Sequence, residues 1–386
     1  MKKEIKVGVI GVGFIGPVHI EAIRRLGHDV LAIAESSQEK AERSANNLRV
    51  PKAYGQWEDL VNDSEINVVL VASPNYLHFP QAKAALEAGK HIICEKPLAI
   101  STAESAALMA LAFEKHLANA VSYNLRFYPL VQESKARIDD GELGERIYII
   151  HGGYLQDWLL FDTDWNWRLE PDLGGKLRAV ADIGSHWIDL VTFIVGTRVK
   201  SVYADLATFL PVRRKPKKEM ATFKGHQVED IGYVNKEIKT EDYATVLLAF
   251  ENGSRGVVTI SQVSSGRKNR LFFEINGSQS SLMWDAEIPN QLWIGHRDKP
   301  NQLIIKDPSI MKEESRWAAS YPGGHAEGYP DTFKQLHKVF FDYIQAGNFD
   351  AEPNYPTFED GHNMLLVEEA IFRSAKERRL VDVEYP

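Results

Sequence analysis

Cysteine is nearly absent from this sequence: Cys94 is the single one in 386 residues. One cysteine cannot form a disulfide within the chain, and such low use is typical of a reducing compartment, so we expect a cytoplasmic protein. No apolar run approaches the ~18–20 residues that a membrane-spanning helix needs, so no membrane association is expected. Positive charge is not in excess either, because 45 Lys and Arg stand against 53 Asp and Glu. The net charge of −8 gives no electrostatic basis for binding nucleic acid.

Internal repeats and low-complexity tracts are also missing, and the composition is that of an ordinary globular protein. At ~150 residues per domain, the length predicts about two domains, which we place at residues 1–123 and 124–386. Residues 5–122 alternate short apolar strands with helical patterns, which predicts an α/β fold with a doubly wound parallel sheet. The predicted strands are Lys6–Ile10, Val30–Ala34, Lys52–Tyr54, Asn67–Ala72, His91–Cys94 and Ala118–Tyr123. The predicted helices are Ile15–Leu26, Gln38–Asn47, His78–Ala88 and Thr102–His116.

The first strand ends in a glycine-rich turn that is typical of dinucleotide sites, with Gly11, Gly13, Phe14, Ile15 and Gly16 as candidate cofactor contacts. Gly11 permits the tight turn, Gly13 lets a pyrophosphate approach the backbone, and Gly16 lets the helix pack on the strand. The following helix N-terminus supplies free N–H groups. A glycine turn that binds no ligand is the alternative interpretation.

An acid, Glu35, ends the second strand 19 residues after Gly16, followed by Ser36. An acid here is placed to accept from the ribose hydroxyls, and its charge favours NAD over NADP. A solvated acid at a strand end is the alternative, and Lys40 and Arg43 leave NADP possible. The next long strand is followed by a polar loop that we expect to line the cofactor or to cap a helix: Ser73, Pro74, Asn75 and His78.

A strand that stops at Glu95-Lys96-Pro97 is the centre of the predicted site. Proline keeps Lys96 out of the helical region, so the strand ends there. A lysine at the carboxyl end of such a strand projects into the crevice where doubly wound folds bind ligands.

After residue 124 an aromatic segment, residues 154–168, holds three of the eight tryptophans within ten residues. Aromatic faces interleaved with polar groups suit a polyol, although such clusters also form cores. Candidate contacts to such a substrate are Tyr154, Gln156, Asp157, Trp165 and Arg178.

Asp182 and His186 are four residues apart, so on a helix they share one face and the carboxylate can orient the imidazole. A two-ligand metal site has the same spacing, but no third and fourth ligand accompany it, so we expect no metal. A capping Asp with an incidental His is the other alternative. The rest of the chain predicts antiparallel strands, two closing helices and a solvated basic loop at Arg213–Lys218. A glycine-rich loop carries His325, which is a further candidate substrate contact.

Five motifs together resemble the glucose-fructose oxidoreductase/inositol dehydrogenase/rhizopine-catabolism (Gfo/Idh/MocA) family. They are Gly11-x-Gly13-x-x-Gly16, Glu95-Lys96-Pro97, Trp167-Arg168 with Gly174-Gly175, Asp182-x-x-x-His186 and the helix start at Pro356. The resemblance implies a Rossmann domain and an α/β domain with an open, mostly antiparallel sheet, often in homodimers or homotetramers. It also implies NAD(P)-dependent chemistry on sugars or cyclitols, and a cis peptide before Pro97. The tryptophan-rich segment is similar to that of glycoside-oxidising members.

By the same resemblance, the expected reaction is hydride transfer from a secondary hydroxyl, with C3 of a sugar, anhydrosugar or glycoside as the expected position. His186, held by Asp182, would take the hydroxyl proton and Lys96 would stabilise the alkoxide; which of the two is the formal base stays open. The residues expected near the cofactor are Glu95, Lys96, Asn124, Trp167 and Arg168. An NAD-dependent glycosidase, an inositol dehydrogenase and a non-catalytic cofactor-binding regulator are the alternatives.

Overall fold

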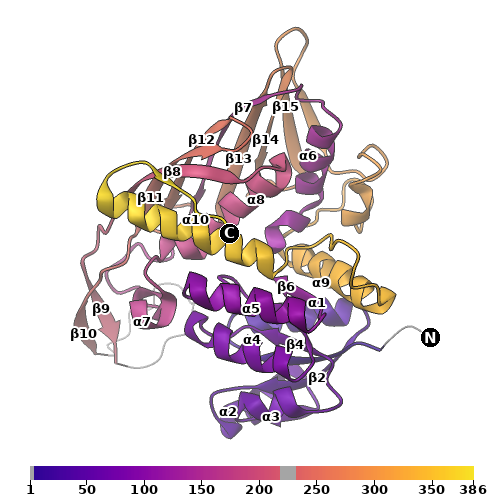
Figure 1. Ribbon diagram of the computed structural model, residues 1–386, viewed down its shortest axis with the longest axis vertical. Coiled ribbons are helices and arrows are strands. Elements are labelled where there is room, and N and C mark those ends of the chain that lie inside the picture. Colours follow the sequence, from indigo (N-terminus) through magenta and orange to yellow (C-terminus); the bar gives the residue numbers. More distant parts are fainter. Residues whose placement is uncertain (1–3, 218–231) are drawn as a thin grey trace. The chain divides into compact units, whose positions relative to one another are not determined.

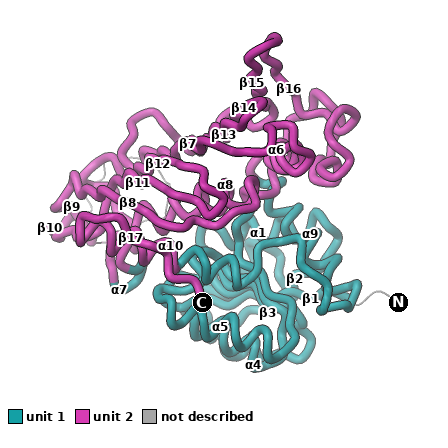
Figure 2. Tube along the Cα trace, turned by 45° about the horizontal axis from the view of Figure 1, so that its top comes forward, with its two compact units in different colours: residues 1–124, 172–175, 330–365 teal, residues 125–171, 176–329, 366–386 magenta. Residues whose placement is uncertain are grey.

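A computed structural model describes residues 4–217 and 232–386 of the chain. The chain divides into two compact units, drawn in different colours in Figure 2. Unit 1 contains residues 1–124, 172–175 and 330–365. Unit 2 contains residues 125–171, 176–329 and 366–386. Lys218 of the predicted basic loop lies outside the described residues.

Unit 1 is built on a parallel sheet of strand order β3-β2-β1-β4-β5-β6, which confirms the predicted doubly wound fold. Its strands are β1 (Lys6–Ile10), β2 (Asp29–Ala34), β3 (Lys52–Tyr54), β4 (Val68–Val71), β5 (His91–Cys94) and β6 (Asn119–Val121). Its helices include α1 (Ile15–Arg25), α2 (Gln38–Leu48), α3 (Trp57–Asn62), α4 (His78–Glu87), α5 (Thr102–Glu114) and α9 (Tyr329–Ala346). In Figure 1, α4 and α5 lie in front of the strands of this sheet.

Local sequence signals account for these helix boundaries. The Ser37 and Ser101 side chains cap α2 and α5 by accepting from the Lys40 and Glu104 backbone N–H groups. The strand order reverses between β1 and β4, so the loops after these two strands lie on either side of the switch point where doubly wound sheets bind ligands. Helix α3 was not predicted, because its six residues are too short to show a helical period.

In the described part of unit 2, nine strands form one sheet of order β16-β15-β14-β13-β7-β12-β11-β8-β17. The β7–β12 pair is parallel and the other pairs are antiparallel, which confirms the open, mostly antiparallel sheet. The strands are β7 (Ile147–Leu155), β8 (Val199–Ala207), β11 (Tyr243–Phe250), β12 (Arg255–Ser261), β13 (Arg270–Gly277), β14 (Ser280–Asp285), β15 (Gln291–His296), β16 (Gln302–Ile305) and β17 (Val381–Asp382).

Shorter elements complete the described chain. A separate hairpin joins β9 (Val212–Pro216) and β10 (Tyr233–Glu237), so residues 212–216 form a strand where a solvated loop was predicted. The main further helices are α6 (Pro129–Asp139), α7 (Pro171–Gly174), α8 (Ser185–Val195) and α10 (Phe358–Glu377). Among the residues that the structure describes, no helix has the length and apolarity needed to cross a membrane.

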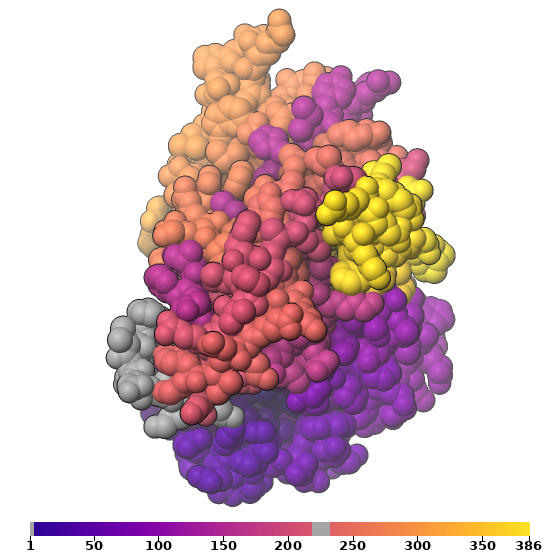
Figure 3. Space-filling view, turned by 90° about the vertical axis from the view of Figure 1, so that its left-hand side faces the viewer, coloured from indigo at the N-terminus to yellow at the C-terminus, as the bar shows by residue number. Residues whose placement is uncertain are grey.

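The large sheet has one buried and one exposed face. Along β11, Ala244, Val246, Leu248 and Phe250 are buried, whereas Leu247 is 51% exposed. Leu247 pairs across the sheet with Tyr203 of β8, which is 41% exposed. Residues of this part of the sheet, rose to salmon in Figure 3, form part of the surface on the side shown.

Candidate active site and cofactor site

The turn after β1 brings three strand ends of unit 1 together at Gly11. Its N–H donates to the Ala34 carbonyl at the end of β2, 3.0 Å away. Gly11 has a φ of +87°, and a Cβ there would lie 2.8 Å from the carbonyl oxygen of Ala72, just after β4. Both the left-handed conformation and this close approach require glycine.

The two other glycines of the turn differ in their surroundings. A Cβ on Gly16 would lie 2.4 Å from the Gly11 carbonyl oxygen, so Gly16 is needed for α1 to pack closely on the turn. A Cβ on Gly13 would meet nothing within 4 Å, so the backbone there faces open space. Helix α1 begins at Ile15 and leaves its first N–H groups without helical partners. This cradle fits a pyrophosphate.

Glu35 follows β2 and closes the same turn. Its Oε1 accepts from the Val12 backbone N–H at 3.2 Å, and its Oε2 accepts from the Ser36 N–H at 3.3 Å. A carboxylate has about four lone-pair sites, so two donors leave capacity for a ribose diol. The side chain is half-buried and fixed by the turn that would hold the phosphates. Phe14, in the same turn, is 53% exposed.

The loop after β4 is tied to neighbouring backbone by its polar side chains. Ser73 Oγ donates to Gln81 Oε1 at 2.6 Å, and Asn75 Nδ2 donates to the Gly174 carbonyl at 3.0 Å. The buried His78 ring lies between the Ser73 and Pro97 carbonyl oxygens, at 2.9 and 2.7 Å. His78 therefore joins this loop to the segment that follows β5, and α4 begins at that residue.

Glu95 and Lys96 follow β5, and the Lys96–Pro97 peptide is cis, which confirms the conformation expected from the resemblance. The buried Glu95 Oε1 lies 2.9 Å from His19 Nε2, and its Oε2 accepts from the Lys96 N–H at 3.2 Å. Burial acts to raise the pKa of this carboxyl, but the hydrogen bond from His19 and nearby positive charge outweigh it and lower the pKa to about 2.

His19 extends this chain into the interior of unit 1. Its Nδ1 lies 2.9 Å from Nε2 of His337 on α9, and burial holds the pKa of His337 well below its usual value. An ionised carboxylate only accepts, so His19 Nε2 is the donor to Glu95. Glu95 is thus held as an anion directly beside Lys96. Asn124, also predicted near the cofactor, donates from Nδ2 to Thr332 Oγ1 at 2.7 Å.

In unit 2, Asp182 and His186 occur on one continuous helical segment, but its first turn is wider than predicted. Residues Val180–Gly184 form a π-helical turn, in which the Ser185 N–H donates to the Val180 carbonyl, and α8 follows directly. Single π turns inside helices are often found at functional sites. Arg168 Nε lies 3.0 Å from Asp182 Oδ1, and Gln262 Nε2 donates to Asp182 Oδ2 at 2.9 Å.

His186 is buried on the first turn of α8, and the aromatic segment approaches it. The Tyr154 and His186 ring centroids are 6.3 Å apart. Tyr154 Oη and Gln156 Nε2 both donate to Asn269 Oδ1, at 2.7 and 2.8 Å. The Tyr154 ring thus lies near His186, while Arg168 and Gln262 hold Asp182 one helical turn before it. Asn269 and Gln262 were not predicted.

Other predicted contacts have different surroundings. Arg178 is fully buried, and its guanidinium is bonded within the interior. Asp157 pairs with Lys268 at 2.8 Å, and Trp165 packs on a small apolar cluster of Leu159, Leu169 and Ile238. Trp167 stacks on Arg168, whose Cζ lies 4.4 Å from the ring centroid. His325 is exposed on its glycine-rich loop. Within residues 4–217 and 232–386, no group of three His, Cys, Asp or Glu could hold a metal ion.

Comparisons with known proteins agree with this geometry. Residues 5–123 match the model of an oxidoreductase family with an NAD-binding Rossmann fold, and residues 131–283 match the GFO/IDH/MocA C-terminal domain. The chain is 30% identical to levoglucosan dehydrogenase of Pseudarthrobacter phenanthrenivorans, over 99% of this chain and 98% of that one.

Solved structures show the same likeness. A levoglucosan dehydrogenase in complex with NADH and L-sorbose is 29% identical over 100% of both chains, with a TM-score of 0.89. An inositol dehydrogenase homologue from Azotobacter vinelandii, complexed with NAD+, is 26% identical over 98% of this chain and 97% of that one, with a TM-score of 0.86. Family models covering most of the chain, the glycine turn and the matched relatives together show that this protein belongs to the Gfo/Idh/MocA family of NAD-binding oxidoreductases.

Proposed function

We propose that this protein is an NAD-dependent dehydrogenase that oxidises a secondary hydroxyl, with C3 as the expected position, of a sugar, anhydrosugar or glycoside. The observation that supports this proposal is in unit 2. There Asp182 pairs with Arg168 and accepts a hydrogen bond from Gln262, and His186 follows on the same helical segment. The relatives of this protein include a levoglucosan dehydrogenase and an inositol dehydrogenase homologue, which also supports the proposal.

Each protein group has one part in the proposed reaction. When bound, NAD+ supplies the acceptor for the hydride that leaves the carbinol carbon. His186 takes the hydroxyl proton, because a neutral imidazole is a suitable base near neutral pH. Asp182, an anion held by two donors, stabilises the imidazolium that forms. The Lys96 ammonium donates to the substrate oxygen and stabilises the developing alkoxide. The hydroxyl becomes a ketone, with one NADH and one proton released.

A reduction screen tests this function. NAD+ and NADP+ are each mixed with levoglucosan, D-glucose, methyl glucoside, D-xylose and myo-inositol, and NADH or NADPH absorbance is followed. We expect NADH formation with at least one pyranose-type compound, a ketone product by mass spectrometry, and none with His186→Ala. Cleavage of an aryl glycoside without net NADH would instead support a glycosidase. Tight NAD+ binding with neither reaction would support a regulator.

Glu35 is expected to set the preference for NAD+. Replacing it by glutamine keeps an acceptor for Val12 but removes the charge that repels a 2′-phosphate. At ~4 Å this charge is worth about 1–4 kcal/mol, so the ratio of kcat/KM for NAD+ over NADP+ should fall about 5- to 1000-fold. Steady-state kinetics with both cofactors measures it. Glu39→Gln, at an exposed acid in the first turn of α2, is the control and should leave the ratio unchanged. An unchanged ratio in Glu35→Gln would contradict the assignment.

The homodimer or homotetramer implied by the family stays a prediction. The exposed Leu247–Tyr203 pair on the outer face of the large sheet supports it, because apolar surface of this kind is often buried between subunits.

A further inference from the structure

The buried side chains behind Asp182 form a continuous network whose closest member is Gln262, the residue after β12. Gln262 Nε2 donates to Asp182 Oδ2 at 2.9 Å, and its Oε1 accepts from Arg178 Nη1 at 3.0 Å. An arginine can only donate, so the amide oxygen must face Arg178 and the amide NH2 must face Asp182. Arg178 thus fixes which end of the amide reaches the carboxylate.

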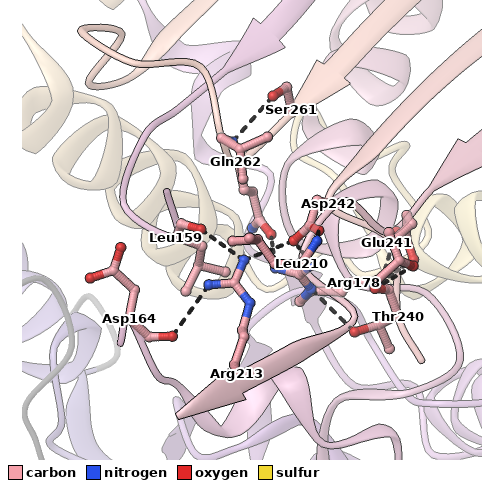
Figure 4. Close-up of polar contacts among 12 residues, drawn as sticks. Leu159, Asp164, Arg178, Leu210, Arg213, Thr240, Glu241, Asp242, Ser261 and Gln262 are labelled. Atoms are coloured by element: carbon pink, nitrogen blue, oxygen red, sulfur yellow. Dashed lines mark hydrogen bonds and ion pairs between the residues drawn. The ribbon is translucent and has the colours of Figure 1, made fainter. Parts of the chain in front are cut away.

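Arg178 is itself held on every side. Its Nε donates to Thr240 Oγ1 at 3.2 Å, and its Nη2 pairs with Asp242, to which Arg213 Nη2 also donates at 2.9 Å. Figure 4 shows the two guanidinium groups converging on Asp242, with the Gln262 side chain reaching toward them. Both arginines and Asp242 have fully buried side chains. A guanidinium fixed in this way cannot turn away from Gln262.

The backbone at the start of the π turn is anchored by Glu241, the residue before Asp242 in the chain. Glu241 Oε1 accepts from the Arg178 and Val180 N–H groups, at 2.8 and 2.9 Å. These donors lie at the start of the segment that carries Asp182, where no preceding helical turn supplies acceptors. The Gln262 backbone N–H donates to the Asp242 carbonyl at 3.1 Å, so Gln262 is attached to the same anchor. The backbone that leads to Asp182 and the Gln262 residue that contacts its carboxylate are therefore held by two adjacent residues, Glu241 and Asp242.

We propose that Gln262 is a positioning residue for the reaction: held by Arg178, it fixes the Asp182 carboxylate in the orientation that serves His186. This inference rests on the proposed function of Asp182 and His186. Arg168 pairs with the other carboxylate oxygen, so replacing Gln262 removes a donor to Oδ2 and leaves the contact at Oδ1 in place. The network also reaches the aromatic segment, because Arg213 donates to the Leu159 and Phe161 carbonyls at 2.7 and 2.8 Å.

Gln262→Glu separates positioning from packing. The glutamate still accepts from Arg178, so the buried network keeps that contact. Its repulsion of Asp182 lowers the melting temperature, but circular dichroism should show that the protein stays folded. The glutamate's ionised carboxylate cannot donate to Asp182 and adds a negative charge beside it. We expect kcat to fall about tenfold or more, as for small misplacements of catalytic groups. KM should change little, and the acid limb of the kcat/KM profile should move to higher pH because added negative charge favours protonation of the base.

The rate of NAD+ reduction is measured across pH with the compound of the reduction screen that the wild type oxidises fastest. Melting temperature and NAD+ affinity are measured for the same variants. Gln262→Met, which adds no charge, should lose kcat without the pH shift. Gln279→Glu, at an exposed position of the same unit, should match the wild type throughout. Asp182→Asn is the reference for the function itself. The inference is overturned if Asp182→Asn loses activity while Gln262→Glu and Gln262→Met keep wild-type kcat and pH profile. Full activity in Asp182→Asn would overturn the proposed function instead.

Discussion

Replacing Lys96 with alanine is expected to lower kcat on the order of 10²–10³-fold, as when one preorganised donor to a developing oxyanion is lost. The lysine follows buried strand β5 and is backed by the anionic Glu95, whose Oε2 accepts from the Lys96 N–H. Binding of NADH should be nearly unchanged, because the glycine turn and Glu35 supply the phosphate and ribose contacts. Stopped-flow or steady-state NADH formation measures the first effect, and fluorescence titration with NADH measures the second.

Two comparisons make the Lys96 result specific. Lys83→Ala removes a half-exposed lysine of the same unit that pairs with Glu87 on α4, and it should keep wild-type kcat. Added primary alkylamines should restore part of the activity of Lys96→Ala, because an ammonium group in the space left by the side chain can donate to the same oxygen. Wild-type kcat in Lys96→Ala across the whole sugar panel would rule out the catalytic role.

Structural features that short stretches of sequence determine, such as strand bounds and the glycine turn, could be predicted closely. Strands β1, β3 and β5 have the predicted bounds. Of these, β1 and β5 are short, mostly apolar runs that end at turn residues. The glycine turn and Glu35 were found by spacing alone, since that spacing is set by one strand–turn–helix unit. The cis peptide at Pro97 was expected only through the family resemblance, because no local pattern distinguishes it from a trans one.

Features set by distant contacts could not be predicted. Arg213 lies in a basic stretch that suggests a solvated loop. It is nevertheless buried, because its guanidinium donates hydrogen bonds to Asp242 and to three carbonyls of the aromatic segment. Gln262 follows a strand and reaches Asp182, 80 residues earlier in the chain. No periodicity links such residues. The π turn likewise escapes prediction, since the spacing of Asp182 and His186 suits an ordinary helix equally well.

Removing the charge of Asp242 should destabilise unit 2 more than any surface change. In Asp242→Asn the buried Arg178 and Arg213 side chains lose their shared counter-charge, and an amide NH2 can face the Leu210 N–H that now donates to Oδ2. Burial acts to raise the pKa of Asp242, but Arg178 outweighs it and holds this pKa below its usual value, so the carboxylate is ionised. Breaking a buried pair costs about 3–5 kcal/mol, or roughly 10 °C in melting temperature.

The control is Asp162→Asn, because Asp162 also accepts two guanidinium hydrogen bonds, in this case both from Arg214, the residue next to Arg213. Its bonds are 2.9 and 3.0 Å long, but both side chains are about half exposed. Water can replace an exposed partner, so the melting temperature should change by no more than about 2 °C. Thermal unfolding by circular dichroism measures both variants. Equal losses would show that burial does not set the stability of these pairs, and the buried network could then not be the rigid support that Asp182 is proposed to have.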